Sequence, residues 1–243
     1  ASGNGAGAGT ITVAGDLYAG ANGALQGGTI AFLADGGDLT FTRVDATASA
    51  HTFAAQNGPG DNATGGSVTL TAGNGGTIGF GDNSRFDVHA YGGDGTSGGN
   101  GHGGTITFLA DGGTITGTGT TYVDASGYAG YSDGLTGLAS GSGTGGDISI
   151  ATGTAGGSLS FGTLDVGADG NFIDPTETSP NVGNGGNGTG GTISITLPSG
   201  TLNASAIAIH ANGTGIPAAA QNGSFGATIF QSGNGKGGTA SFD

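Results

Sequence analysis

The fold is decided by a short motif that is clearest at Gly103-Gly104-Thr105-Ile106-Thr107-Phe108. Two glycines are followed by one small or polar residue and one apolar residue, and polar and apolar side chains then continue to alternate. Related glycine pairs end at positions 28, 66, 104, 146, 191 and 238, which gives steps of 38, 38, 42, 45 and 47 residues. A fixed pattern with a growing period predicts one repeated structural unit that carries a loop of variable length.

The unit that begins at Gly103 predicts three short strands. Alternation over 105–108 indicates the first strand, a glycine turn follows at 111–113, Ile115 lies in a second strand, and 122–125 form a third. A Gly/Ser-rich stretch then leads to the next glycine pair. The same arrangement recurs along the chain, and the variable loops are expected at 46–64, 90–102, 126–144, 168–189 and 211–236.

Strands this short cannot bury an apolar face alone, but stacked coils close a continuous core between them. We therefore expect an all-β, right-handed parallel β-solenoid with three strands per coil and about six coils of 38–47 residues, in one domain spanning 1–243. A β-sandwich is the alternative, although sandwiches rarely keep so regular a period. Two inward rows should form the core. The first row is Ile30, Val68, Ile106, Ile148 and Ile193, and the second is Phe32, Leu70, Phe108, Ile150 and Ile195.

Composition narrows the function. Three Lys and Arg against 17 Asp and Glu give a formal net charge of −14, which would repel nucleic acids and anionic membranes. Glycine makes up 61 of 243 residues, but it has no three-residue period, so collagen is excluded. The absence of cysteine removes disulfides and thiolate metal sites. Apolar runs are too short for a transmembrane segment.

The segment from Gly103 through Val123-Asp124-Ala125-Ser126-Gly127 into the next glycine pair resembles the right-handed β-helices of filamentous-haemagglutinin-like exoproteins and autotransporter passengers of Gram-negative bacteria. The resemblance covers nearly the whole chain. It implies secretion, attachment to the cell surface, and adhesion to surface glycans or host ligands. We therefore expect a non-catalytic, extracellular structural or adhesive fibre segment, as in a surface adhesin or a biofilm-matrix filament.

An ice-binding protein is the alternative function. The outward positions of the first strands carry small hydroxyl side chains that would stack into two ladders at ~4.8 Å per coil, as in the Thr-x-Thr faces of solenoid antifreeze proteins. Ala31 and Asp147 interrupt the array. The residues of this face are Thr29, Ser67, Thr69, Thr105, Thr107, Thr192 and Ser194.

Acidic residues suggest a cation site. Asp45, Asp87, Asp124 and Asp165 are expected at one outward position of successive third strands, where their mutual repulsion would be relieved by Ca²⁺ or by raised pKa values. Solvated aspartates that splay apart are the alternative interpretation. A second acidic cluster surrounds the fourth of these aspartates and also offers oxygen ligands. Its members are Asp165, Asp169, Asn171, Asp174 and Glu177.

A β-helix carbohydrate-active enzyme is the third function considered. Such enzymes need a cleft with paired carboxylates or a basic residue. The chain offers only Arg43, Arg85 and Lys236, in separate coils. We expect no catalytic residue and no cofactor other than Ca²⁺.

Both ends match only part of a coil. Residues 1–26 are expected to supply second and third strands only, and 237–243 a first strand only. Either the chain continues into flanking coils of a longer solenoid, or copies stack head to tail. The residues expected at these contacts are Thr10, Ile11, Val13, Leu17, Thr239 and Phe242.

Overall fold

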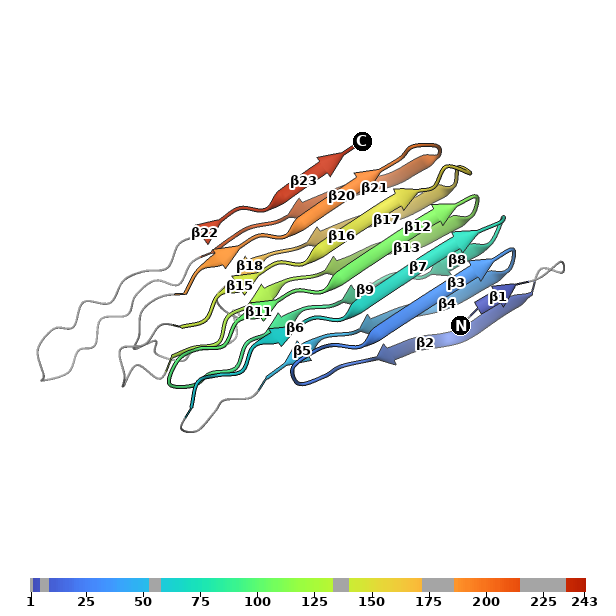
Figure 1. Cartoon of the computed structure of the whole chain (residues 1–243). Coiled ribbons are helices and arrows are strands. Elements are labelled where there is room, and N and C mark those ends of the chain that lie inside the picture. The colour runs from blue at the N-terminus through green and yellow to red at the C-terminus, as the bar shows by residue number, and fades with distance from the viewer. Residues whose placement is uncertain (1, 5–8, 53–57, 133–139, 172–185, 215–234) are drawn as a thin grey trace, which may run out of the picture.

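A computed structural model describes residues 2–4, 9–52, 58–132, 140–171, 186–214 and 235–243. It confirms an all-β parallel solenoid, in which every pairing between named strands is parallel and joins neighbouring coils. Two long sheets face each other as flat layers, and the described ends of the chain lie at opposite ends of the stack (Figure 1).

The strands in the described part of the chain form four sheets. Sheet A contains β1 (Ser2–Asn4), β3 (Thr29–Asp35), β7 (Ser67–Gly73), β12 (Thr105–Asp111), β16 (Asp147–Thr152), β20 (Thr192–Thr196) and β23 (Thr239–Phe242). Sheet B contains β2 (Thr10–Gly20), β4 (Asp38–Thr47), β8 (Thr77–Phe80), β9 (Ser84–Asp87), β13 (Thr114–Asp124), β17 (Ser158–Gly167) and β21 (Thr201–His210). Sheet C contains β5 (Ala50–His51), β10 (Ala90–Tyr91), β14 (Gly127–Tyr128) and β18 (Gly170–Asn171). Sheet D contains β6 (Ala63–Thr64), β11 (Gly101–His102), β15 (Gly143–Thr144), β19 (Gly188–Thr189) and β22 (Gly235–Lys236).

The coils differ in detail from the expected three strands. The expected second and third strands are one long strand of sheet B in most coils, with a register irregularity between Gly117 and Thr120 in β13. Among the described coils, only one has two separate strands here, β8 and β9. Short strands of sheets C and D lie inside the stretches expected to be loops, for example β5 and β6 inside 46–64, and each is too short to show any alternation. The described residues form about four coils rather than the expected six.

The core lies between sheets A and B, as the alternation predicts. Both expected rows are in register across the coils, for example Val68 beside Ile106 and Phe108 beside Ile150. Phe86 and Phe108 pack edge to face from the two sheets, with ring centroids 4.9 Å apart. Side chains of these rows in the central coils are fully buried, so the core of these coils is closed to solvent.

The glycine pairs lie along a line, here called the pinch line, where the backbones of the two layers come closest together. A Cβ added at Gly103 would lie 1.8 Å from the carbonyl oxygen of Ala125 in the opposite layer, and one at Gly104 would lie 2.1 Å from that of Gly66 in the preceding coil. The amide of Gly104 also donates to the carbonyl of Val88 across the layers, at 2.8 Å. The repeated motif therefore exists because backbone meets backbone on two sides.

The opposite edge of each coil is a tight turn from sheet A to sheet B. In the coil that contains β12 and β13, Gly112 occupies this turn with φ 75°, a conformation that glycine adopts without steric cost. Beyond the pinch line, Ala50, Ala63 and Ala90 form a second small apolar cluster between sheets C and D.

One expectation about the ends is wrong. Residues 1–26 do contribute a strand of sheet A, because β1 pairs with Leu33–Asp35. Its sequence, Ser2-Gly3-Asn4, contains no apolar residue and so gives no alternation signal. The strand expected at the other end is confirmed as β23, which pairs with β20.

Candidate functional site

Polar and aromatic side chains form four outward rows where sheet B continues into sheet C. Row 1 is Tyr18, Asp45, Arg85, Tyr122, Asp165 and Ala208. Row 2 is Gly20, Thr47, Asp87, Asp124, Gly167 and His210. Row 3 directly precedes sheet C and is Asn22, Ser49, His89, Ser126, Asp169 and Asn212. Row 4 includes His51, Tyr91 and Tyr128.

The single row of four aspartates expected from the sequence is wrong. Asp45 and Asp165 lie in row 1, whereas Asp87 and Asp124 lie in row 2. The cause is strand alternation: both neighbours of an inward residue point outward. Asp45 and Asp165 precede their inward residues, and the other two aspartates follow theirs. The inward row that fixes this register is Ala46, Phe86, Val123 and Val166.

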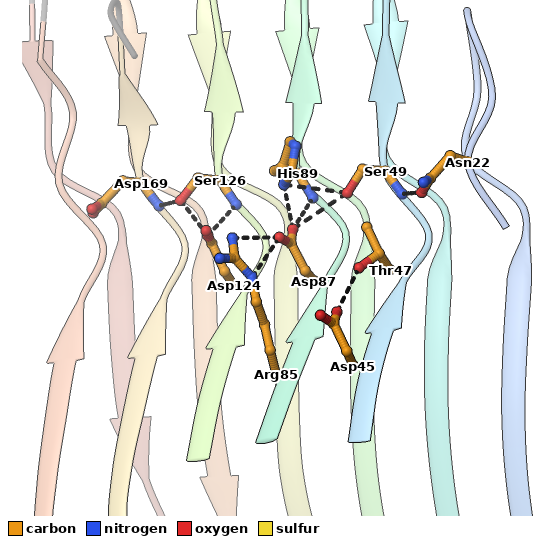
Figure 2. Close-up of polar contacts among 10 residues, drawn as sticks. All are labelled: Asn22, Asp45, Thr47, Ser49, Arg85, Asp87, His89, Asp124, Ser126 and Asp169. Atoms are coloured by element: carbon orange, nitrogen blue, oxygen red, sulfur yellow. Dashed lines mark hydrogen bonds and ion pairs between the residues drawn. The ribbon is translucent and has the colours of Figure 1, made fainter. Parts of the chain in front are cut away.

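Asp87 is the most buried carboxylate of this face, with a side chain only 2% exposed. Nε of Arg85 donates to it at 2.9 Å, Oγ of Ser49 donates at 3.3 Å, and Nδ1 of His89 forms a hydrogen bond with it (Figure 2). Burial alone would raise the pKa of Asp87, but the hydrogen bond and charge of His89, together with the charge of Arg85, hold it below its usual value.

Asp124 lies beside Asp87 in row 2 and responds in the opposite way. Its Oδ1 accepts hydrogen bonds from the amide and the hydroxyl of Ser126, at 2.9 and 2.6 Å. Burial and the charge of Asp87 nevertheless raise the pKa of Asp124. Burial and the nearby charge of Asp124 also raise the pKa of Tyr128 to about 12, so this phenol keeps its proton at neutral pH.

Three of these groups have the geometry of a metal site. Ligand atoms of Asp87, His89 and Asp124 all lie within 4.8 Å of one another. Arg85, however, already supplies a positive charge to Asp87, and the pKa of Asp124 is raised. Both features reduce the repulsion for which Ca²⁺ was expected, and Ca²⁺ binding stays a prediction.

A hollow of about 250 Å³ opens on this face over Gly167. The ring of His210 lies next to Gly167, with Nε2 3.0 Å from Oδ1 of Asp165 and Nδ1 3.2 Å from Oδ2 of Asp169. Burial would lower the pKa of His210, but its contacts with these two carboxylates raise it. The rest of the lining includes Arg85, Tyr122, Asp124, Ser126 and Tyr128.

The sequence-based reasoning missed this convergence. Arg85 was expected to be isolated in its own coil, but stacking brings it to the same hollow as His210, from three coils further along. Tyr91 and Tyr128 were also missed: their rings stack at 4.4 Å, with 10° between their planes. A signal was present, because each tyrosine follows a row 2 aspartate by four residues.

The second expected cation cluster is only partly described. Asp165 and Asp169 both face His210. Asn171 pairs through its backbone with Tyr128, and Asp174 and Glu177 lie outside the described residues.

The expected ice-binding face lies on the outward side of sheet A. Its two ladders are in register, with Thr105 beside Ser67 and Thr107 beside Thr69. Ala31 and Asp147 interrupt the ladders at the positions expected. The remaining members, Thr29, Thr192 and Ser194, occupy equivalent positions.

At the ends of the stack, Ile11 is 39% and Phe242 61% exposed. Val13 and Leu17 pack partly against the core, and Thr10 and Thr239 are exposed. In the described part of the chain, no helix is long and apolar enough to cross a membrane. The chain matches no protein family, no curated protein and no solved structure.

Proposed function

We propose that the chain is a non-catalytic structural and adhesive segment of an extracellular, cell-surface solenoid fibre. The observation that carries this proposal is the unbroken register of the core from coil to coil, as at Ile106 between Val68 and Ile148. Each coil buries its apolar face only against its neighbours, so stiffness and reach grow with the number of coils. The outward rows leave one face for recognition of a surface ligand.

The ends of the stack suggest how a fibre continues. Ile11 on β2 and Phe242 on β23 occupy core positions of their strands but lack a covering coil. Open sheet edges also present unpaired backbone groups. Further coils, either of a longer chain or of a second copy stacked head to tail, would cover these core side chains and pair the open sheet edges. Because the two end surfaces differ, head-to-tail contacts generate an open filament rather than a closed dimer.

Adhesion is the direct test. Beads coated with the chain should remain attached to glycan-bearing cell surfaces under flow. The control is a bead coated with an unrelated folded protein of equal net charge. Equal retention of both beads would contradict the adhesive function.

Self-assembly is tested separately by light scattering and electron microscopy over a range of protein concentrations. Filaments that the wild-type chain forms, and that Phe242→Asp abolishes, would support head-to-tail stacking. The matched control is Ser241→Asp, which introduces the same charge on the outward side of the same strand. Wild-type chains that stay monomeric would contradict stacking of copies. The flanking coils of a longer chain would then be the structures that cover the two end surfaces.

Ice binding is a second candidate, favoured by the register of the hydroxyl ladders on sheet A. If it is correct, the chain shapes ice crystals in supercooled solution, and Thr107→Tyr abolishes the shaping. Thr116→Tyr, on the outward side of sheet B, serves as the control. Crystals that grow as they do in buffer would exclude this function.

A further inference from the structure

Four exposed asparagines in the described part of the chain begin an Asn-x-Ser/Thr motif. This motif is the acceptor signal for N-linked sugars. The four are Asn62, Asn187, Asn203 and Asn212, and a fifth, Asn222, lies outside the described residues. The motif at Asn62 has the best-defined geometry, because a contact with the next coil fixes the orientation of its side-chain amide.

Strand alternation presents the two reactive members of this motif together. Asn62 directly precedes β6, whose residues are Ala63 and Thr64. Ala63 is only 2% exposed and packs in the small apolar cluster between sheets C and D, whereas Asn62 and Thr64 are exposed. Alternate residues of an extended strand share one side. The side-chain amide and the hydroxyl therefore both face solvent, and an enzyme can reach them without unfolding the coil.

The side-chain amide of Asn62 is held with its nitrogen available. The backbone amide of Asn100, on the next coil, donates a hydrogen bond to Oδ1 of Asn62 at 2.7 Å. Only the oxygen of a side-chain amide can accept such a bond, so the oxygen must face Asn100. Within the described part of the chain, Nδ2 of Asn62 has no hydrogen-bond partner. This nitrogen is the atom to which an N-linked sugar is attached.

The next coil contains a matched asparagine that lacks the motif. Asn100 precedes β11, which pairs with β6, so it occupies the same outward row as Asn62 and is also exposed. Its Oδ1 likewise accepts a hydrogen bond from a backbone amide one coil further on, that of Ser142, at 2.8 Å. Two residues later, however, stands His102 in place of a threonine. The two asparagines therefore share their exposure and their amide contact and differ in the third residue of the motif.

We propose that Asn62 is an N-glycosylation site of the folded solenoid. Nδ2 of Asn62 attacks the anomeric carbon of a sugar that is activated by a diphosphate. A C–N bond forms, the bond from that carbon to the diphosphate oxygen breaks, the diphosphate leaves with the electron pair, and Nδ2 releases one proton. Oδ1 takes no part in the new bond, so its contact with Asn100 persists. The inference concerns a group that the chain carries, and it does not depend on the ligand to which the fibre adheres.

The first test is peptide mass spectrometry of the chain isolated from the cells that produce it. We expect a sugar on Asn62 and none on Asn100. The mass of the attached group separates a single sugar, taken from a nucleotide-activated donor, from an oligosaccharide, taken from a lipid-linked donor, and either mass supports the proposal. An unmodified Asn62, or equal modification of Asn100, would overturn it.

The second test uses the purified, folded chain with an N-glycosyltransferase and a nucleotide-activated hexose, in the absence of denaturant. Thr64→Val keeps the shape of the side chain but removes the hydroxyl, so it should abolish transfer to Asn62. His102→Thr completes the motif at Asn100 and should place a sugar there. Circular dichroism confirms that each variant is folded. Transfer to Asn62 that persists in Thr64→Val, or that requires denaturation of the wild-type chain, would overturn the proposal.

Discussion

The carboxyl groups of Asp87 and Asp124 lie side by side in row 2, and their pKa values are shifted in opposite directions. Arg85 and His89 contact the first carboxylate and stabilise its charge. The second is also largely enclosed, but among the residues that the structure describes only Ser126 donates a hydrogen bond to it, and it faces the charge of the first. The register of the coils gives these two carboxyl groups different neighbours, and their pKa values therefore shift in opposite directions.

Asp124→Asn should raise the melting temperature at neutral pH. Because the folded-state pKa of Asp124 is raised, its ionisation opposes folding as pH rises from the unfolded value near 3.8 through the folded value. The gain from the variant should therefore be small at pH 3 and larger at pH 7.

Melting curves across this range check the prediction, with Asp87→Asn as the comparison. The pKa of Asp87 is lowered, so its contribution to stability is present above pH 3.8 and is lost as pH falls through the folded value. Asp87→Asn should destabilise the fold at pH 7. A Tm gain in both variants would contradict the contrast described here.

His210→Asn should destabilise the fold more at low pH than at high pH. The folded-state pKa of His210 is raised, so its contribution is fully present below about pH 6.5 and is lost as pH rises through the folded value. The Tm difference from wild type should be largest near pH 5.5 and smallest near pH 8.5. The exposed His102 provides the control, His102→Asn, and a parallel pH dependence in both variants would refute the contribution of the His210 contacts.

Ile106→Asp should cost several kcal/mol of unfolding free energy, because it places a charge without a partner in the middle of the core. Thr107→Asp introduces the same group on the outward side of the same strand and should change stability by less than about 1 kcal/mol. Denaturant titration measures both. Similar midpoints for the two variants would show that the inward and outward assignments are wrong.

Gly104→Ala tests the pinch line between the layers. The added Cβ would overlap the carbonyl oxygen of Gly66, and backbone must move to relieve the contact, at a typical cost of about 1–3 kcal/mol. Gly79→Ala meets nothing closer than 3.9 Å and should be neutral or slightly stabilising. Equal stability of the two variants in denaturant would contradict the close approach.

Periodicity was sufficient to predict the solenoid and the core rows, because apolar alternation and the glycine pairs both reflect contacts that recur in every coil. Ile106 and Phe108 could be placed from the sequence for that reason. The outward rows could not be aligned in the same way. An aspartate on either side of an inward residue gives the same local pattern, so Asp45 and Asp87 were placed together although they lie in different rows.

The hollow could not be predicted from the sequence, for a related reason. Gly167 is one of many glycines, and only the register shows that side chains surround it on the neighbouring coil and along its own strand. The strands of sheets C and D were missed because two residues are too few to display alternation. Tyr128, which joins the hollow from sheet C, was therefore placed in a loop.

The register of the outward rows is tested most directly by disulfide formation between introduced cysteines, since the chain contains none. Tyr122 and Asp165 are paired on adjacent strands, about 4.8 Å apart, which suits a disulfide. Asp124 and Asp165 are diagonal, at about 8 Å from one strand spacing and two residues of rise, which is beyond its reach. Under mild oxidation the Tyr122→Cys/Asp165→Cys variant should cross-link nearly completely and the Asp124→Cys/Asp165→Cys variant should stay reduced. The reverse result would contradict the register on which the rows and the hollow depend.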